Sequence, residues 1–142
     1  MRRVPTAFSL LLLALAAFAA GCSDKTDTPT TPTTVTTTTE TFSGTVDQLG
    51  TAGHSFVVST TGTVTISLTS LGPLSTMSMG LGIATWNGTA CGTAVSKNDD
   101  SRSGKTALTG TAVAGNYCVT VYDSGNVPAG TTVSYTVDVK HP

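Results

Sequence analysis

Charged and aromatic side chains are scarce in this sequence. Of its 142 residues, 11% are charged and 6% are aromatic, and the formal net charge is −1. Nucleic acids and anionic membrane surfaces attract clusters of Lys and Arg, so this composition excludes both as main partners. Long apolar runs are missing too. The longest, residues 7–20, is shorter than the about 20 residues that a membrane-spanning helix needs.

Enzyme motifs are also missing. The sequence has no Gly-x-Ser-x-Gly elbow, no HExxH motif and no glycine-rich phosphate loop. Its two histidines are His54, which falls in a strand-like alternation, and His141, where fraying near the chain end would prevent accurate positioning. We therefore predict that the protein is not an enzyme and needs no catalytic cofactor.

The first 22 residues have the layout of an exported, lipid-modified protein. Arg2 and Arg3 precede the apolar run, and three small residues (19–21) precede Cys22. This stretch resembles the lipobox at which bacterial signal peptidase II cuts before a cysteine that carries diacylglycerol. The resemblance implies that residues 1–21 are a removed signal peptide and that acylated Cys22 anchors the chain in the lipid bilayer. The alternative is an ordinary secreted protein with an unmodified cysteine.

Two further features bear on the compartment. Ser23, rather than aspartate, follows Cys22, and in Gram-negative lipoproteins of this kind such a residue implies the outer membrane. The three cysteines would leave one thiol unpaired in an oxidising compartment unless Cys22 is acylated. Cys91 and Cys118 then form a natural disulfide that closes a loop of about 28 residues. A metal site is the alternative, but neither cysteine has a CxxC partner or a nearby histidine.

Threonine dominates the segment after Cys22. It accounts for 11 of the 16 residues from 26 to 41, and Val35 is the only large apolar residue among them. A segment with nothing to bury cannot offset its ordering entropy. We predict a disordered tether over residues 22–41 and one folded domain over residues 42–142.

The domain alternates apolar residues with threonine and serine. This pattern predicts strands at residues 54–59, 63–69, 77–83, 105–113, 117–123 and 131–140. The first two strands are expected to form a hairpin, Asn87-Gly88 predicts a type I′ turn, and residues 95–104 read as an exposed polar loop. Strand signals that begin at Phe42, together with the strand expected after the Asn87-Gly88 turn, bring the number to seven or eight. Seven or eight short strands without a helix favour an all-β fold, an antiparallel β-sandwich.

Five segments of the domain carry a family resemblance: residues 44–46, 54–58, 62–66, 114–121 and 134–137. Their order of turns and strands resembles the bacterial pre-peptidase C-terminal domain. The resemblance implies a jelly-roll-like β-sandwich without catalytic residues, acting as an accessory or inhibitory partner of a secreted peptidase. No peptidase accompanies it within these 142 residues, so such a partner would be encoded separately.

Two weaker candidate sites remain. Asn98, Asp99 and Asp100, with Asp123, form an oxygen-rich group of the kind that calcium prefers, although a solvated loop with ordinary turn residues is the simpler interpretation. Trp86 lies beside a turn, where it is either a sugar contact or a partly buried anchor. We expect a lipid-anchored envelope protein that presents a non-catalytic module to an envelope protein or glycan. The alternatives are the peptidase partner and a carbohydrate-binding module.

Overall fold

The computed structural model describes residues 34–142, and every regular element in this range is a β-strand. The eight strands are β1 (Thr38–Asp47), β2 (Thr51–Val58), β3 (Gly62–Gly72), β4 (Ser78–Trp86), β5 (Cys91–Arg102), β6 (Lys105–Ala112), β7 (Gly115–Tyr122) and β8 (Thr132–His141). The all-β prediction is confirmed. No helix in residues 34–142 has the length and apolar character needed to cross a membrane.

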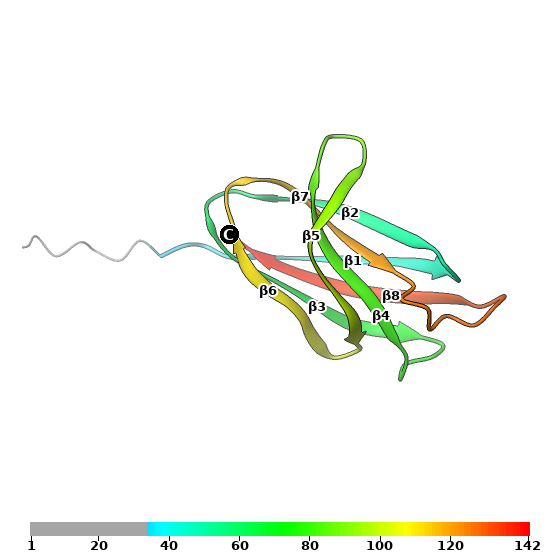
Figure 1. The fold of residues 1–142 in the computed structure, drawn as a ribbon. Coiled ribbons are helices and arrows are strands. Elements are labelled where there is room, and N and C mark those ends of the chain that lie inside the picture. The colour runs from blue at the N-terminus through cyan, green and yellow to red at the C-terminus, as the bar shows by residue number, and fades with distance from the viewer. Residues whose placement is uncertain (1–33) are drawn as a thin grey trace, which may run out of the picture. The chain divides into compact units, whose positions relative to one another are not determined.

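The strands form two four-stranded antiparallel sheets that pack face to face (Figure 1). One sheet has the order β1-β8-β3-β6, and the other has the order β2-β7-β4-β5. Among the described strands, only β4 and β5 are both consecutive in sequence and paired. Every other connection passes from one sheet to the other. Eight strands in this order make a jelly roll, the fold that the family resemblance implied.

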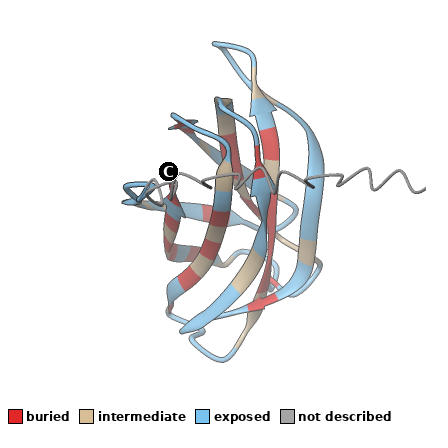
Figure 2. Ribbon diagram, turned by 90° about the vertical axis from the view of Figure 1, so that its left-hand side faces the viewer, coloured by how far each residue is buried: buried red, intermediate tan, exposed pale blue. Residues whose placement is uncertain are grey.

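Inward-facing side chains from both sheets form one core. In β8, the buried residues Val133, Tyr135, Val137 and Val139 alternate with polar residues that reach the solvent. Figure 2 shows buried and exposed positions alternating along other strands as well. Successive side chains of a strand point to opposite faces, so this sequence pattern places one face of each sheet in the core.

The predicted hairpin between residues 54–59 and 63–69 is wrong. β2 pairs with β7, whereas β3 pairs with β6 and β8, so residues 59–61 cross from one sheet to the other. Two strands that each bury one face show the same alternation in a hairpin and in a sandwich crossing. The short Gly-containing connection therefore did not distinguish the two.

The predicted loop at residues 95–104 is also wrong, because most of it belongs to β5. β5 is the last strand of its sheet, and nearly all its side chains are exposed. An edge strand with charged side chains discourages pairing with another chain, and it shows no apolar alternation. Its polar sequence therefore resembled a loop.

The turn at Asn87-Gly88 does join two paired strands, but it is not of type I′. Four residues, 87–90, connect Trp86 to its partner Cys91, and only Gly88 has a positive φ, of 96°. The Asn87 Oδ1 atom accepts hydrogen bonds from the backbone N–H groups of Thr89 and Ala90, at 2.9 and 2.8 Å. The Asn87 side chain therefore closes a longer loop.

The folded domain starts four residues earlier than predicted. β1 begins at Thr38, which pairs with His141, and the Thr41 hydroxyl donates to Asp138 Oδ1 at 2.7 Å. Pairing with β8 orders these threonines although they bury little apolar surface. The predicted signal peptide, Cys22 and most of the predicted tether lie outside the described residues.

The predicted disulfide is confirmed. Cys91 and Cys118 are bonded, with their Cα atoms 5.9 Å apart. Cys118 is fully buried on central strand β7, and Cys91 starts β5, so the bond fixes the end of the β4–β5 hairpin to the middle of its sheet. A Cβ atom at Gly53 would lie 2.6 Å from the Cys91 sulfur. Glycine at that position therefore lets the hairpin pack on β2.

The outer face of the β1-β8-β3-β6 sheet is rich in hydroxyl groups. Neighbouring strands place them side by side, as in the pairs Ser43–Thr136 at 3.1 Å and Ser67–Thr106 at 3.2 Å. Threonine combines a β-branched shape that suits strands with a hydroxyl that suits water. This face accounts for much of the threonine in the domain without invoking a ligand.

Candidate functional site

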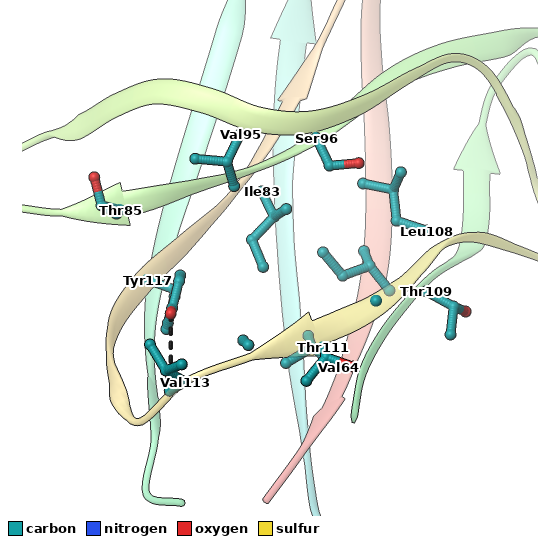
Figure 3. A pocket seen from close by; sticks show the side chains of 13 residues that line it. Val64, Ile83, Thr85, Val95, Ser96, Leu108, Thr109, Thr111, Val113 and Tyr117 are labelled. Carbon is teal, nitrogen blue, oxygen red and sulfur yellow. Dashed lines mark hydrogen bonds between the residues drawn. The ribbon is translucent and has the colours of Figure 1, made fainter. Parts of the chain in front are cut away.

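A cavity of about 420 Å³ opens between β5 and β6, and we call it the edge cavity. β5 and β6 are each the last strand of their sheet, and residues 103–104 join them. The inner wall of the cavity consists of Val64 and Ile66, which belong to the apolar core, and of Ile83 and Tyr117, which are partly buried and pack against the core. Figure 3 shows these lining side chains, with Ile83 next to Val95 and Tyr117 next to Val113.

Small side chains on β6 create the edge cavity. Gly110 and Ala112 line it on the inward-facing register of β6, and a Cβ atom at Gly110 would meet no atom within 4 Å. Two larger apolar residues at the rim are exposed to solvent: Val95 is 68% exposed and Val113 is 63% exposed. The sandwich is therefore closed over most of its length and open at this edge.

The polar groups of the edge cavity are hydroxyls and backbone atoms. Thr85 and Ser96 lie on its β4 and β5 sides, and the Tyr117 hydroxyl donates to the carbonyl of Val113 at 3.1 Å. None of the residues that line the cavity carries a charge. A concave, mostly apolar site with a few polar groups suits an aliphatic group rather than an ionic one.

The sequence alone did not indicate the edge cavity. Finding it requires the knowledge that Gly110 and Ala112 lie on an edge strand and that Val95, on the edge strand of the other sheet, lines the same cavity. The one available signal was the presence of two small residues at inward positions of the predicted strand 105–113. That signal has no meaning until the neighbours of the strand are known.

The predicted calcium residues do not assemble into a site. Among residues 34–142, no three His, Cys, Asp or Glu side chains gather closely enough to hold a metal ion. Asn98 donates to the carbonyl of Ala107 at 3.0 Å, and Asp100 pairs with Arg102 at 3.0 Å on the surface. Asp99 pairs with Lys97 at 3.2 Å. Nothing in this part of the chain therefore supports calcium binding.

Asp123 instead organises two loops. Its Oδ1 atom accepts hydrogen bonds from three successive N–H groups, of residues 125–127, at 2.8–3.0 Å. Its Oδ2 atom accepts from Leu49, which has a positive φ of 58°, at 2.9 Å. Burial raises the pKa of Asp123, but these four backbone donors together outweigh burial and lower the pKa below its usual value.

Asp99 also accepts a hydrogen bond from the Tyr122 hydroxyl, at 2.5 Å. This bond and the nearby Lys97 lower the pKa of Asp99, while burial and the Asp99 carboxylate raise the pKa of Tyr122 to about 12. The Tyr122 ring covers Gly80, where a Cβ atom would lie 2.1 Å from it. Glycine at this position therefore leaves room for the Tyr122 side chain.

We expect this pair to be visible in a tyrosine titration. In the wild type, the ultraviolet signal of tyrosinate should include a step near pH 12 from Tyr122, and Tyr122→Phe should remove that step. Asp99→Asn should move the step to lower pH, because the neutral amide no longer opposes ionisation. An unchanged step in Tyr122→Phe would assign it to another tyrosine.

Both histidines have structural partners. His54 Nε2 lies 2.7 Å from the Tyr135 hydroxyl, and its ring stacks on Phe42 with centroids 5.0 Å apart. Burial lowers the pKa of His54 and raises that of Tyr135. The predicted fraying at His141 is wrong. His141 is buried, and its Nε2 atom lies 2.9 Å from Glu40 Oε1. Neither histidine lines the edge cavity.

Trp86 is half-buried at the end of β4. It lines a shallow, open depression with Gly53, Cys91 and Thr120, and this depression has fewer apolar walls than the edge cavity. A sugar contact at Trp86 stays a prediction, because no second aromatic residue lines the depression.

The comparisons with known proteins show a similar fold. No family model matches the chain, and no curated protein matches it in sequence. A similar solved structure is that of PliG from Aeromonas hydrophila, described as a periplasmic lysozyme inhibitor of g-type lysozyme. It matches with a TM-score of 0.51 over 71% of this chain and 83% of that chain, at 17% sequence identity. This likeness shows the fold alone.

The resemblance to the pre-peptidase C-terminal domain therefore rests on its order of strands and turns. The jelly-roll topology agrees with it, but an eight-stranded sandwich hosts many unrelated functions. Function has to be argued from the edge cavity and from the residues around it.

Proposed function

We propose that this protein is a lipid-anchored, non-catalytic binding module of the bacterial cell envelope that inhibits a cell-wall or secreted hydrolase. The observation that carries the proposal is the apolar edge cavity between two edge strands. Edge strands offer backbone donors and acceptors to another polypeptide, and the cavity offers apolar surface beside them. Together these features suit a protein partner.

The chemistry of the edge cavity argues for binding rather than catalysis. Its hydroxyl groups belong to Thr, Ser and Tyr, and no His, Asp, Glu or Lys lines it to act as a base. A serine or threonine nucleophile needs such a base within hydrogen-bond reach. His54 and His141 are held by Tyr135 and Glu40 instead.

The structural likeness to a periplasmic lysozyme inhibitor makes lysozymes the first enzymes to test. A secreted peptidase is the second class, because the strand pattern resembles the pre-peptidase C-terminal domain. A carbohydrate-binding module built around Trp86 is the remaining alternative. It has less support, since a single half-buried aromatic residue offers little stacking surface.

The inhibitory role is tested with the full-length protein solubilised from membranes in detergent. Goose-type and other lysozymes and a panel of secreted peptidases are assayed with increasing amounts of the protein. We expect activity to fall in proportion to the added protein and to reach its minimum near a 1:1 ratio for at least one enzyme. Absence of both inhibition and complex formation across the panel would overturn the proposal.

The anchor is tested separately. Cys22→Ser removes the residue proposed to carry the acyl chains. It should therefore abolish labelling by a radioactive fatty acid and release the protein from the membrane fraction, because stable attachment needs two or more acyl chains. Ser23→Ala serves as the matched control and should keep both the label and the membrane location. A Cys22→Ser protein that stays labelled would show that Cys22 is not the acylated residue.

A further inference from the structure

The free edge of β6 is a backbone surface next to the edge cavity. β6 pairs with β3 on one side and has no strand on the other among the described residues. No strand pairs with its backbone N–H and C=O groups on that side in this part of the chain, although the Ala107 carbonyl accepts a hydrogen bond from the Asn98 side chain at 3.0 Å. Such an edge is a template for an added strand unless charges, proline or a covering segment block it.

β6 has little of this protection. From Thr106 to Ala112 it carries no charged residue and no proline, whereas edge strands β1 and β5 each carry at least two charged side chains. Edge strand β2 is also uncharged apart from His54, but Phe42 of β1 stacks on that ring and covers its inner side. β6 is thus the edge strand that combines an uncharged stretch with a cavity beneath it.

A charged residue at one end of β6 would favour one direction for a partner strand that pairs with it. Lys105 is the first residue of β6, and no ion pair of Lys105 is found among residues 34–142. In an antiparallel pair, the carboxyl end of the added strand lies opposite the start of β6. An acidic residue at that end would complement Lys105.

We infer that an extended segment of the partner protein adds to β6 as an antiparallel strand, inserts an aliphatic side chain into the edge cavity beside Gly110, and places an acidic residue near Lys105. This inference deepens the proposed function and rests on it for the identity of the partner. A polypeptide fits better than a lipid chain, because only a polypeptide can satisfy the exposed backbone groups of β6.

Gly110→Val is the decisive variant, because it fills the cavity without straining the fold. Gly110 does not have a positive φ, and its Cβ position is open space. Valine also suits a strand better than glycine does. We expect a melting temperature equal to or above that of the wild type. Partner binding should weaken by about 30-fold, the factor that burial of one leucine side chain supports.

The probe is a fluorescent peptide of alternating threonine and leucine that ends in aspartate. Its control has the same sequence with alternate backbone nitrogens methylated, so that it keeps the side chains but cannot pair with a strand edge. Binding to the full-length protein is followed by fluorescence anisotropy, and hydrogen exchange is measured over β6. The probe should slow exchange in β6, whereas the methylated peptide should not bind.

Two variants complete the design. Thr106→Val, on the outer face of β6 and outside the cavity lining, should leave peptide affinity unchanged. Lys105→Glu should weaken the peptide by about threefold, as expected of an exposed ion pair, and a peptide that ends in lysine should regain the loss.

The outcomes separate this inference from the proposed function. If an enzyme is inhibited equally well by wild type and Gly110→Val, strand addition at β6 is wrong while the inhibitory role stands. If the probe slows hydrogen exchange in β6 and Gly110→Val abolishes this slowing, but no enzyme is inhibited, strand addition stands and the proposed function falls. If neither the probe nor an inhibited enzyme protects β6, the inference is overturned.

Discussion

Replacing both Cys91 and Cys118 with alanine is expected to lower the free energy of unfolding by about 3.5 kcal/mol. The disulfide joins residues 27 positions apart in sequence, so it removes a large loop entropy from the unfolded chain. For a domain of this size, the melting temperature should fall by about 15 °C. Urea unfolding followed by the fluorescence of Trp86, the only tryptophan, measures the change.

Reduction provides the matched control for the disulfide. Dithiothreitol should destabilise the wild type by a similar amount and leave the double alanine variant unchanged. The β4–β5 hairpin should also exchange its amide hydrogens faster in the variant, because Cys91 fixes it to buried Cys118. A loss below about 1 kcal/mol would mean that the unfolded chain keeps the two segments together without the bond.

Sequence patterns predicted the strands that bury one face. Val64, Ile66 and Leu68 are buried as their alternation predicts, and so are the valines of β8. These strands lie between two neighbours, so one of their faces has to be apolar. The jelly-roll order then agreed with a resemblance carried by turns and strands rather than by any single residue.

The edges of the sheets could not be predicted in the same way. β5 lies in solvent on most of its length, so its sequence carries charge where a central strand would carry apolar residues. β1 begins inside a run of threonines that has no apolar signal, because its order comes from pairing with β8. Both edges depend on partners that are distant in sequence.

The candidate site depends on the same long-range information. Gly110, Ala112, Val95 and Val113 come from segments that the sequence pattern read as a plain strand and a loop. Only the order of strands places β5 and β6 at one side of the sandwich. The edge cavity exists because Gly110 and Ala112 have small side chains, and small residues form no recognisable sequence motif. The sequence therefore drew attention to the oxygen-rich residues and to Trp86, and it did not indicate the cavity.

Asp123→Ala is expected to lower the free energy of unfolding by about 2 kcal/mol at pH 7. The carboxylate accepts four backbone hydrogen bonds, and an alanine leaves those N–H groups to water. The estimate is kept near the value of one charge-assisted hydrogen bond, because Asp123 is partly exposed and solvent screens it. Urea unfolding at pH 7 measures the loss.

The effect of Asp123 should depend on pH in a defined direction. Its pKa is lower in the folded protein than its usual value of 3.8, so the folded state binds its proton less readily than the unfolded state does. The stabilisation is therefore complete above about pH 4 and is lost as the pH falls through the folded pKa. The stabilities of wild type and Asp123→Ala should therefore approach each other as the pH falls below 3.8, the usual pKa of the carboxyl group.

Asp100→Ala and calcium distinguish a loop anchor from a metal ligand. Asp100 makes a surface ion pair with Arg102, so its removal should cost less than about 1 kcal/mol at any pH. Calcium should leave the melting temperatures of wild type and both variants unchanged, since the Asp123 oxygens already accept backbone hydrogen bonds. If calcium instead raised the wild-type melting temperature but not that of Asp123→Ala, Asp123 would have to exchange these donors for a metal ion. The assignment of Asp123 as a loop anchor would then be wrong.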